Sequence, residues 1–463
     1  MKRSAISLLA CMFLAACGQY PNVHEDAVAS GELAATGVQG GIGVPGATDP
    51  GALGDTGVPG DPGAIGAGGT TGTTAGGTTA GGTTGGGTTG GGTTAAAGGD
   101  ATGVTDSEIV IGIHAPLTGA APLKSESFNS GKDMYWKYGN DGKPVTIHGR
   151  TVRVVFQDDH YNPSHARAVC QQMAEDEKAF LLIGGGGTDQ IQACAQYAAS
   201  KGIPYLSAGV TEVGLTRLPN YFAVSMSYAA QAKLLAQYIK ANQSAFGWDG
   251  QANRVAMVAT NTPNFTDAVQ SFQAALPGVK IIRPSKSDRG SNMAAQLCTG
   301  ISKNYDIVFP ITAPTYFLEM AGAAKCNPQY AGVGVTMGLN QVASTGCRTG
   351  GVANSRFFSP APAYAQSGQF DPVFAKAPGT KDDIVFLLWG ISKTLHQLFL
   401  KAGPNLTRQG FIQSTSNATV KTGVYPDLRY TPSNHFGASQ VHVLRADCQS
   451  GQYQTEATFR SSF

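Results

Sequence analysis

Residues 108–119 read EIVIGIHAPLTG, and this stretch decides how the rest of the chain is interpreted. Its first seven residues are rich in β-branched side chains and stop shortly before Pro116, which is typical of a buried strand followed by a loop. Residues 130–138 then place apolar side chains at helical spacing. The opening of the folded region is therefore predicted to be strand, loop and helix.

The same order recurs along the chain. A strand over 152–157 ends at the carboxylate pair Asp158–Asp159, and Asn162 and Pro163 stand where the N-cap and first residue of a helix belong. Further strands are expected at 180–183, 203–206, 254–259, 279–282, 306–309 and 330–335, and helices at 190–199, 229–240, 266–275, 292–303, 316–324 and 383–402. Such alternation predicts an α/β fold with parallel sheets covered by helices on both faces. Because roughly 355 residues exceed what one core usually serves, two Rossmann-like lobes are expected.

The first residues of the chain have the pattern of an export signal. Lys2 and Arg3 precede an apolar run over residues 5–16 that is too short to span a bilayer as a mature helix. The ending, Leu-Ala-Ala-Cys17-Gly, resembles a bacterial lipobox, in which the chain is cut before the cysteine and the thiol is diacylated. This resemblance implies a signal peptide over 1–16 and a lipid anchor at Cys17 on the outer face of the bacterial cell membrane. An ordinary secretory signal that contains a cysteine is the alternative.

Residues 17–105 are predicted to form a disordered Gly/Thr/Pro-rich tether. Glycine keeps a period of three from Gly51 to Gly66, a collagen-like pattern too short for a secure triple helix. From Gly69 to Gly99 the chain repeats Gly-Gly-Thr-Thr without a large apolar residue, so it has nothing to bury in a core. A collagen-like trimerising adhesin is the alternative. The folded domain is expected over 106–463.

Charge and cysteine content limit the partners. A formal net charge of +2 gives no electrostatic reason to expect a nucleic-acid partner. Apart from Cys11 and Cys17, the cysteines are even in number, which predicts disulfides in an oxidising compartment. We expect neighbours to pair, Cys170 with Cys194 and Cys298 with Cys326, leaving Cys347 with Cys448. Because no Cys-x-x-Cys pair occurs and no His lies at ligand spacing from these cysteines, a metal site is not expected. No cofactor is expected either.

Two loops that follow predicted strands are candidates for ligand binding. They are Gly184–Gly187 with Thr188, and residues 207–211. Backbone N–H groups and the partial positive charge of a helix start suit a carboxylate or another acceptor-rich group. Helix capping is the simpler explanation of Thr188 and Thr211. A dinucleotide site is disfavoured because the ordered Gly-x-Gly-x-x-Gly pattern is missing.

From Glu108 to Leu444 the chain resembles the extracytoplasmic solute receptors of the branched-chain amino acid transporter family, which have a type I periplasmic-binding fold. The resemblance is carried, in order, by residues 111–119, 129–131, 157–163, 184–188 and 202–207. It implies two lobes joined by a three-segment hinge, the first over 107–225 and 363–438 and the second over 226–362 and 439–463. It also implies a ligand in the cleft, in contact with Thr188, Gly209 and Thr211.

Two positions depart from the ligand-binding pattern of that family. Lys124 occupies the position at which the branched-chain receptors have a tyrosine over the ligand. Met337 falls near the position at which they have an acidic residue that pairs with the ligand's ammonium group. An amino acid would lack this counter-charge, so a small carboxylate or an uncharged solute should fit at least as well, with Lys124 as an anion partner. The simpler alternative for Lys124 is a solvated loop lysine. Phe265, Thr312 and Tyr316 are expected to form walls of the site from the second lobe, with core packing as the alternative.

No nucleophile or metalloprotease motif occurs, and Asp158–Asp159 is expected to shape a loop, so the chain is not expected to be an enzyme. We expect a lipid-anchored monomeric receptor that captures a small organic solute, which is amino acid-like, a carboxylate or an amide. It would deliver the solute to the permease subunits of an ABC importer. The alternatives are a ligand sensor on the same fold and a structural cell-surface protein built on the Gly/Thr tract.

Overall fold

The computed structural model describes residues 99–207 and 213–463. The predictions for the signal peptide, for Cys17, for the tether up to residue 98, and for Gly209 and Thr211 fall on residues outside these ranges. Within the described ranges, no helix combines the length and the apolar character needed to cross a membrane.

The first part of the described chain forms a five-stranded parallel sheet with the order β2-β1-β3-β4-β5. Its strands are β1 (Glu108–Ala115), β2 (Thr151–Asp158), β3 (Leu181–Gly184), β4 (Tyr205–Ser207) and β5 (Tyr221–Ala223). The helices that follow the first three strands are α2 (Ser125–Tyr138), α3 (Pro163–Glu175) and α4 (Thr188–Ser200). As predicted, Asn162 caps α3, because its side chain accepts hydrogen bonds from the Ser164 and His165 N–H groups at 2.9 and 3.0 Å.

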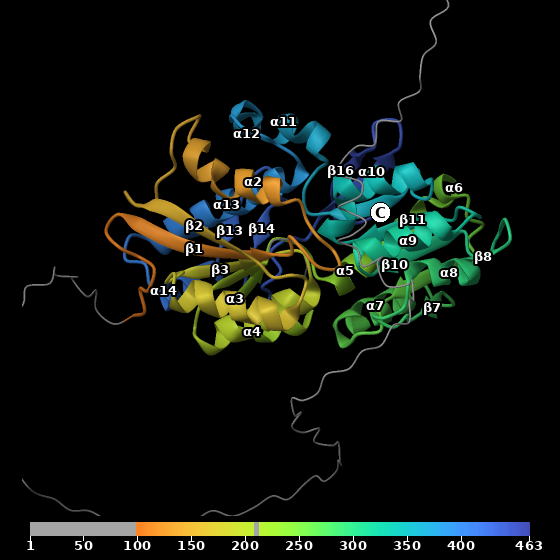
Figure 1. Ribbon diagram of the computed structural model, residues 1–463, viewed down its shortest axis with the longest axis horizontal. Helices are drawn as coiled ribbons and strands as arrows, with labels where there is room; N and C mark the ends of the chain where they lie inside the picture. Colours follow the sequence, from red (N-terminus) through yellow and green to blue (C-terminus); the bar gives the residue numbers. More distant parts are fainter. Residues whose placement is uncertain (1–98, 208–212) are drawn as a thin grey trace, which may run out of the picture. The chain divides into compact units, whose positions relative to one another are not determined.

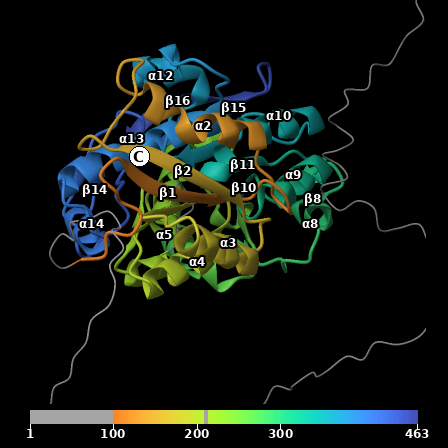
Figure 2. The same cartoon turned by 60° about the vertical axis from the view of Figure 1, so that its left-hand side comes forward.

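Alternate residues of β1 face different helices. Val110 packs with the side chains of α3 and α4, whereas Ile109, Ile111 and Ile113 pack with those of α2 and of α13 (Asp383–Ala402). Figures 1 and 2 show α3 and α4 on one side of this sheet and α2 and α13 on the other. Because successive strand residues point to opposite faces, an uninterrupted apolar run fits a strand that is buried on both faces.

The second sheet has seven strands in the order β16-β15-β12-β11-β10-β6-β7. They are β6 (Val255–Ala259), β7 (Lys280–Ile282), β10 (Ile307–Ile311), β11 (Gln329–Val333), β12 (Arg356–Ser359), β15 (Val441–Asp447) and β16 (Gln452–Arg460). In this sheet the neighbouring strands β12, β11, β10, β6 and β7 are parallel. Strand β15 pairs with β12 and with β16 in the antiparallel sense. The expectation of parallel sheets therefore fails at this edge: β15 runs antiparallel to β12, and the short turn between β15 and β16 permits only an antiparallel pair of these two strands.

Helices cover both faces of the second sheet. Met257 of β6 packs with the helices α5 and α7, and its neighbours Ala256 and Val258 pack on the opposite face with α8, α9 and α10. These helices are α5 (Tyr228–Ala241), α7 (Thr266–Ala275), α8 (Gly290–Leu297), α9 (Pro314–Ala323) and α10 (Asn340–Thr349). The shorter elements are α6 (Gln243–Phe246), α11 (Ser367–Phe370), α12 (Pro372–Lys376), α14 (Arg408–Thr415) and the two-stranded ladders β8 (Cys298–Thr299) with β9 (Ser302–Lys303) and β13 (Thr419–Val420) with β14 (Leu428–Arg429).

The chain passes between the two sheets three times. It leaves the first sheet after β5, returns from β12 to α13, which packs on α2, and enters the second sheet again at β15. A parallel bridge between Ala223 and Phe436 extends the first sheet just before the last crossing.

Several boundaries differ from the predictions, and two of these differences change the local architecture. The helix expected over 292–303 ends at Leu297, because residues 298–303 turn back as the β8–β9 ladder around Gly300, whose φ is 62°. At the N-terminal side, residues 99–105 were assigned to the tether, yet Asp100 is paired with the buried Arg408 at 2.7 Å. Arg408 also donates to the backbone carbonyls of Ala179 and Phe180, so this pair fixes the start of the fold ahead of residue 106.

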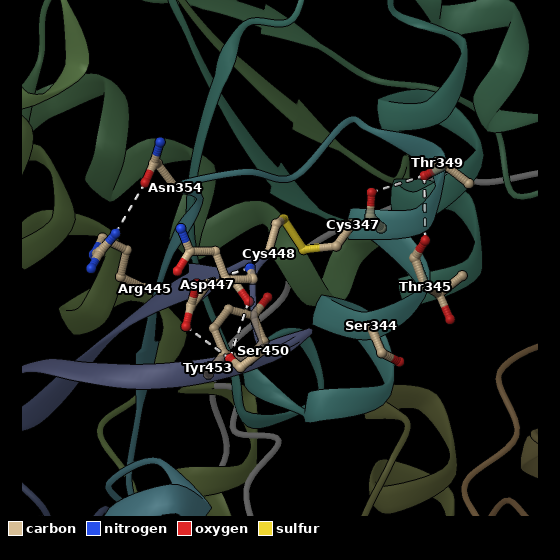
Figure 3. The surroundings of a disulfide bond; sticks show 12 residues. Ser344, Thr345, Cys347, Thr349, Asn354, Arg445, Asp447, Cys448, Ser450 and Tyr453 are labelled. Atoms are coloured by element: carbon tan, nitrogen blue, oxygen red, sulfur yellow. Dashed lines mark hydrogen bonds between the residues drawn. A yellow bond between two sulfur atoms is a disulfide. The ribbon is translucent and has the colours of Figure 1, made fainter. Parts of the chain in front are cut away.

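The three disulfides join the predicted partners. They are Cys170–Cys194, Cys298–Cys326 and Cys347–Cys448, with Cα–Cα distances of 5.9, 5.7 and 5.2 Å. The first is fully buried between α3 and α4. The last connects α10 to the turn between β15 and β16, as Figure 3 shows.

Candidate functional site

Loops from both sheets line a common cavity of about 280 Å³. The first sheet contributes the segments after β1, β2 and β3, and the second contributes those after β6, β7, β10 and β11. All of these segments follow the carboxyl ends of parallel strands, where open α/β sheets place their ligands. The cavity thus lies where the sequence predicted a cleft.

The loop after β2 is held in a strained conformation that brings Tyr161 to the cavity wall. His160 and Tyr161 have φ values of 53° and 52°, which side chains other than glycine rarely adopt. Asp158 accepts from the His160 N–H group at 2.9 Å and Asp159 from the Tyr161 N–H group at 2.9 Å. The carboxylate pair therefore shapes this loop, as expected from the sequence.

The hydroxyl of Tyr161 remains protonated at neutral pH. Burial and the charges of Asp189 and Asp159 raise the pKa of Tyr161 to about 12. Asp159 also binds His114 Nδ1 at 2.8 Å, and His114 Nε2 lies 2.7 Å from the Tyr205 hydroxyl, so the carboxylate is anchored in the core of the first sheet.

The start of α4 supplies a mostly buried polar wall. Thr188 and Gln190 are 8% and 3% exposed, and both line the cavity. Tyr228, the first residue of α5, lines the cavity together with Thr188. Burial raises the pKa of Tyr228 well above its ordinary value, so this phenol stays protonated, and the carboxylate of this wall is that of Asp189.

The loops of the two sheets contact each other directly at the cavity. Asp189 of α4 accepts hydrogen bonds from Asn264 and from Lys286, which both belong to the second-sheet side. Nearby, the Thr315 hydroxyl donates to the Ala120 carbonyl at 2.9 Å. The carboxylate of Asp189 is therefore already neutralised by protein groups.

The second sheet contributes mainly apolar and hydroxyl groups. Phe265, Thr312, Tyr316 and Met337 all line the cavity, and Met337 is only 3% exposed. The Tyr316 hydroxyl is buried without a hydrogen-bond partner among the described residues. Burial and the charges of Asp288 and Glu319 raise the pKa of Tyr316.

The remaining charged residues of the cavity are exposed. They are Asp288, Arg289 and Glu319, on α9 and on the segment that leads into α8. Asp288 accepts from the Ser285 N–H group at 2.7 Å and Glu319 from the Gly290 N–H group at 3.0 Å. The prediction that an amino acid would lack a counter-charge considered only Met337, and these exposed carboxylates qualify it.

The structure brings together five of the eight residues expected at the ligand. Thr188, Phe265, Thr312, Tyr316 and Met337 line the cavity. Lys124 is not among the lining residues, and it is exposed just ahead of α2. Gly209 and Thr211 lie outside the described residues. Ligand contact remains a prediction for all eight residues.

Sequence reasoning missed Tyr161, Gln190 and the contacts of Asp189. Tyr161 stands between the carboxylate pair and the helix start at Asn162, a place where a chain turns at the end of a strand. Gln190 lies in the first turn of α4, two residues after Thr188. Both positions could have been found by treating every residue between a strand end and the first helical turn as a candidate.

Within residues 99–207 and 213–463, one group of side chains has the composition of a metal site. Ligand atoms of His114, Cys170 and Cys194 lie within 4.8 Å of one another. The two sulfur atoms are bonded to each other, and the imidazole nitrogens contact Asp159 and Tyr205. The cluster therefore has no free ligand atoms for a metal ion.

Two sheets that present their strand ends to one shared cavity define a two-lobed binding protein with the type I periplasmic-binding fold. Residues 108–452 match the family model described as periplasmic binding protein, and the chain belongs to this family. Its members are substrate-binding receptors rather than enzymes, and membership places the binding region outside the cytoplasm. No curated protein matches the chain by sequence.

Solved structures support the fold. A fatty acid ABC transporter substrate-binding protein from Thermomonospora curvata aligns with a TM-score of 0.63 at 16% identity, covering 78% of this chain and 95% of that one. An ABC transporter solute-binding protein from R. palustris in complex with 4-hydroxybenzoate gives 0.62 at 14% identity, covering 76% and 96%. A branched-chain amino acid transporter substrate-binding protein from Streptococcus pneumoniae in complex with isoleucine gives 0.62 at 14%, covering 76% and 100%.

Proposed function

We propose that this protein captures a small organic solute in the cavity between its sheets and delivers it to the permease subunits of an ABC importer. The cavity is the observation that carries this proposal, because segments from both sheets line it. The solute is amino acid-like, a carboxylate or an amide. The structurally similar proteins are named for fatty acid, 4-hydroxybenzoate and isoleucine, all of which have a carboxylate and an apolar body.

Binding is proposed to close two lobes over the solute. The first comprises residues 107–225 and 363–438, and the second comprises 226–362 and 439–463. Direct contacts such as that between Asp189 and Lys286 support this motion, because they are made by loops of different sheets and would break if the sheets separated. A solute that contacts both sides favours the closed state by mass action.

The receptor is proposed to be a monomer held at the outer face of the cell membrane by a diacylated Cys17. The support is the lipobox-like sequence around this residue and the basic, apolar signal ahead of it. Two acyl chains hold a protein firmly where one does not.

Purification of the full chain, followed by native mass spectrometry, tests the proposal by detecting any solute that copurifies. Calorimetry with that solute should give a 1:1 complex, and solution scattering should show a smaller radius of gyration after binding. Thr188→Ala should weaken binding by about 0.5 to 3 kcal/mol, the range for loss of one hydrogen bond. Lys143→Ala, at an exposed position outside the cavity lining, should leave affinity unchanged. Unchanged affinity in the Thr188 variant, or no change in dimensions, would contradict the proposal.

A further inference from the structure

Gln190 is a mostly buried residue whose side-chain amide is available at the cavity. Its side chain is 3% exposed and lines the cavity. Among residues 99–207 and 213–463, its amide has no hydrogen-bond partner. The amide atoms of Gln190 are not among the polar atoms that are sealed from solvent without a partner, so they reach the cavity and are available to a solute.

The chain makes room for this amide. A Cβ atom at Gly187 would lie 1.9 Å from the Gln190 Oε1 atom, so only glycine leaves the amide where it is. The backbone at Gly187 has a φ of −130°, which any residue adopts, so glycine is needed here for space and not for conformation.

The chemistry around Gln190 is neutral. The nearby wall consists of Thr188, Tyr161 and Tyr228, whose phenols stay protonated. The one adjacent carboxylate, Asp189, is paired with Lys286. The other charged groups of the cavity, Asp288, Arg289 and Glu319, belong to exposed residues.

A side-chain amide offers both donors and an acceptor. A carboxylate would use only the donors and an ammonium group only the acceptor, so either would leave part of the Gln190 amide without a partner. A carboxamide or a similar uncharged group uses both and adds no charge.

Resting on the proposed receptor function, we propose that Gln190 is a specificity-determining residue that selects a solute with an uncharged hydrogen-bonding group, such as a carboxamide. The solute presents this group to the Gln190 amide, and its ionic group lies among the exposed charges near Arg289. The apolar body of the solute contacts Phe265 and Met337.

The first test needs no ligand. Gln190→Met keeps the volume and removes the amide, and the melting temperature of the full chain without added solute should stay unchanged or rise. A structural glutamine would instead lose stability on this change. Gln172→Met, at an exposed position of α3, is the matched control. A fall of several degrees for Gln190→Met but not for the control would overturn the proposal.

The second test uses isosteric probes. The first pair is asparagine and leucine, which share a zwitterionic end, and the second is succinamate and 4-methylpentanoate, which share a carboxylate. The other end is a carboxamide in asparagine and succinamate and an isopropyl group in leucine and 4-methylpentanoate. In calorimetry, the carboxamide member of at least one pair should bind at least tenfold more tightly. This preference should disappear in Gln190→Met and shrink in Gly187→Ala, whose added Cβ displaces the amide.

The outcomes separate this inference from the proposed function. Tighter binding of the isopropyl members, or a carboxamide preference that survives in Gln190→Met, overturns the role of Gln190 while leaving a solute receptor. Failure of all four probes overturns the carboxamide class. Absence of any copurifying solute and of closure is instead the result that speaks against the receptor itself.

Discussion

Removal of the Cys347–Cys448 disulfide should be the most informative single test of what stabilises this fold. The bond closes a loop over a sequence separation of 101 residues. A crosslink that closes a loop of this length restricts the unfolded chain by about 4.7 kcal/mol, against about 3.6 kcal/mol for the 28-residue separation of Cys298–Cys326. We therefore expect the free energy of unfolding of the Cys347→Ser, Cys448→Ser double variant to be about 4 to 5 kcal/mol lower than that of the wild type.

The surroundings of this bond make the magnitude interpretable. Cys448 is exposed and Cys347 half-buried, so serine at these positions leaves no cavity in a core. The adjacent turn is held independently, because Asp447 accepts from the Gln449 N–H group at 3.0 Å and from the Ser450 hydroxyl at 2.8 Å (Figure 3). The native contacts should survive, and the loss should arise in the unfolded state.

Urea unfolding followed by circular dichroism measures the change. Along with a lower midpoint, the slope of free energy against urea should increase, because the unfolded chain without the crosslink exposes more surface. Ser450→Ala is the control, since it removes one hydrogen bond of the turn and should cost less than about 1.5 kcal/mol. A loss below about 2 kcal/mol in the double variant, or an unchanged slope, would refute the loop-closure reasoning.

Three further predictions concern pH, the start of the fold and closure. Burial lowers the pKa of His442 to about 3 in the folded protein. The contribution of neutral His442 to the free energy of unfolding is therefore complete above its ordinary pKa of 6.5 and is lost as the pH falls towards 3, because only the unfolded chain takes up a proton in this range. At pH 5 the decrease in the free energy of unfolding from this histidine is about 2 kcal/mol. In urea unfolding, the His442→Leu variant should therefore lose about 2 kcal/mol less than the wild type between pH 7 and pH 5. Arg408→Met should lower the free energy of unfolding by about 2 to 4 kcal/mol, because the carbonyls of Ala179 and Phe180 lose their donor, and a loss near zero would contradict this role. Asp189→Asn should increase the radius of gyration of the solute-free protein by weakening its contact with Lys286, and an unchanged scattering curve would count against this contact as a clasp.

Local sequence patterns predicted most of the architecture. The apolar run of β1 and the capped start of α3 were readable because strand burial and helix capping depend on neighbours a few residues apart. The disulfide partners followed from proximity along the chain for Cys170–Cys194 and Cys298–Cys326. The helix expected to run to residue 303 was wrong, because the pairing of Cys298 with Cys326 and the turn at Gly300 favour a ladder over another helical turn.

The sequence by itself determined two α/β units, their order and the strand ends that could hold a ligand. Only the tertiary structure decided which side chains meet there. Asp189 and Lys286 are 97 residues apart, and the position of Gln190 at the cavity is recognised only in the folded structure. The physical reason is that helix and strand periodicity arise from contacts within a segment, whereas the charge and hydrogen-bond balance of a cavity arises from loops of two sheets that the fold brings together.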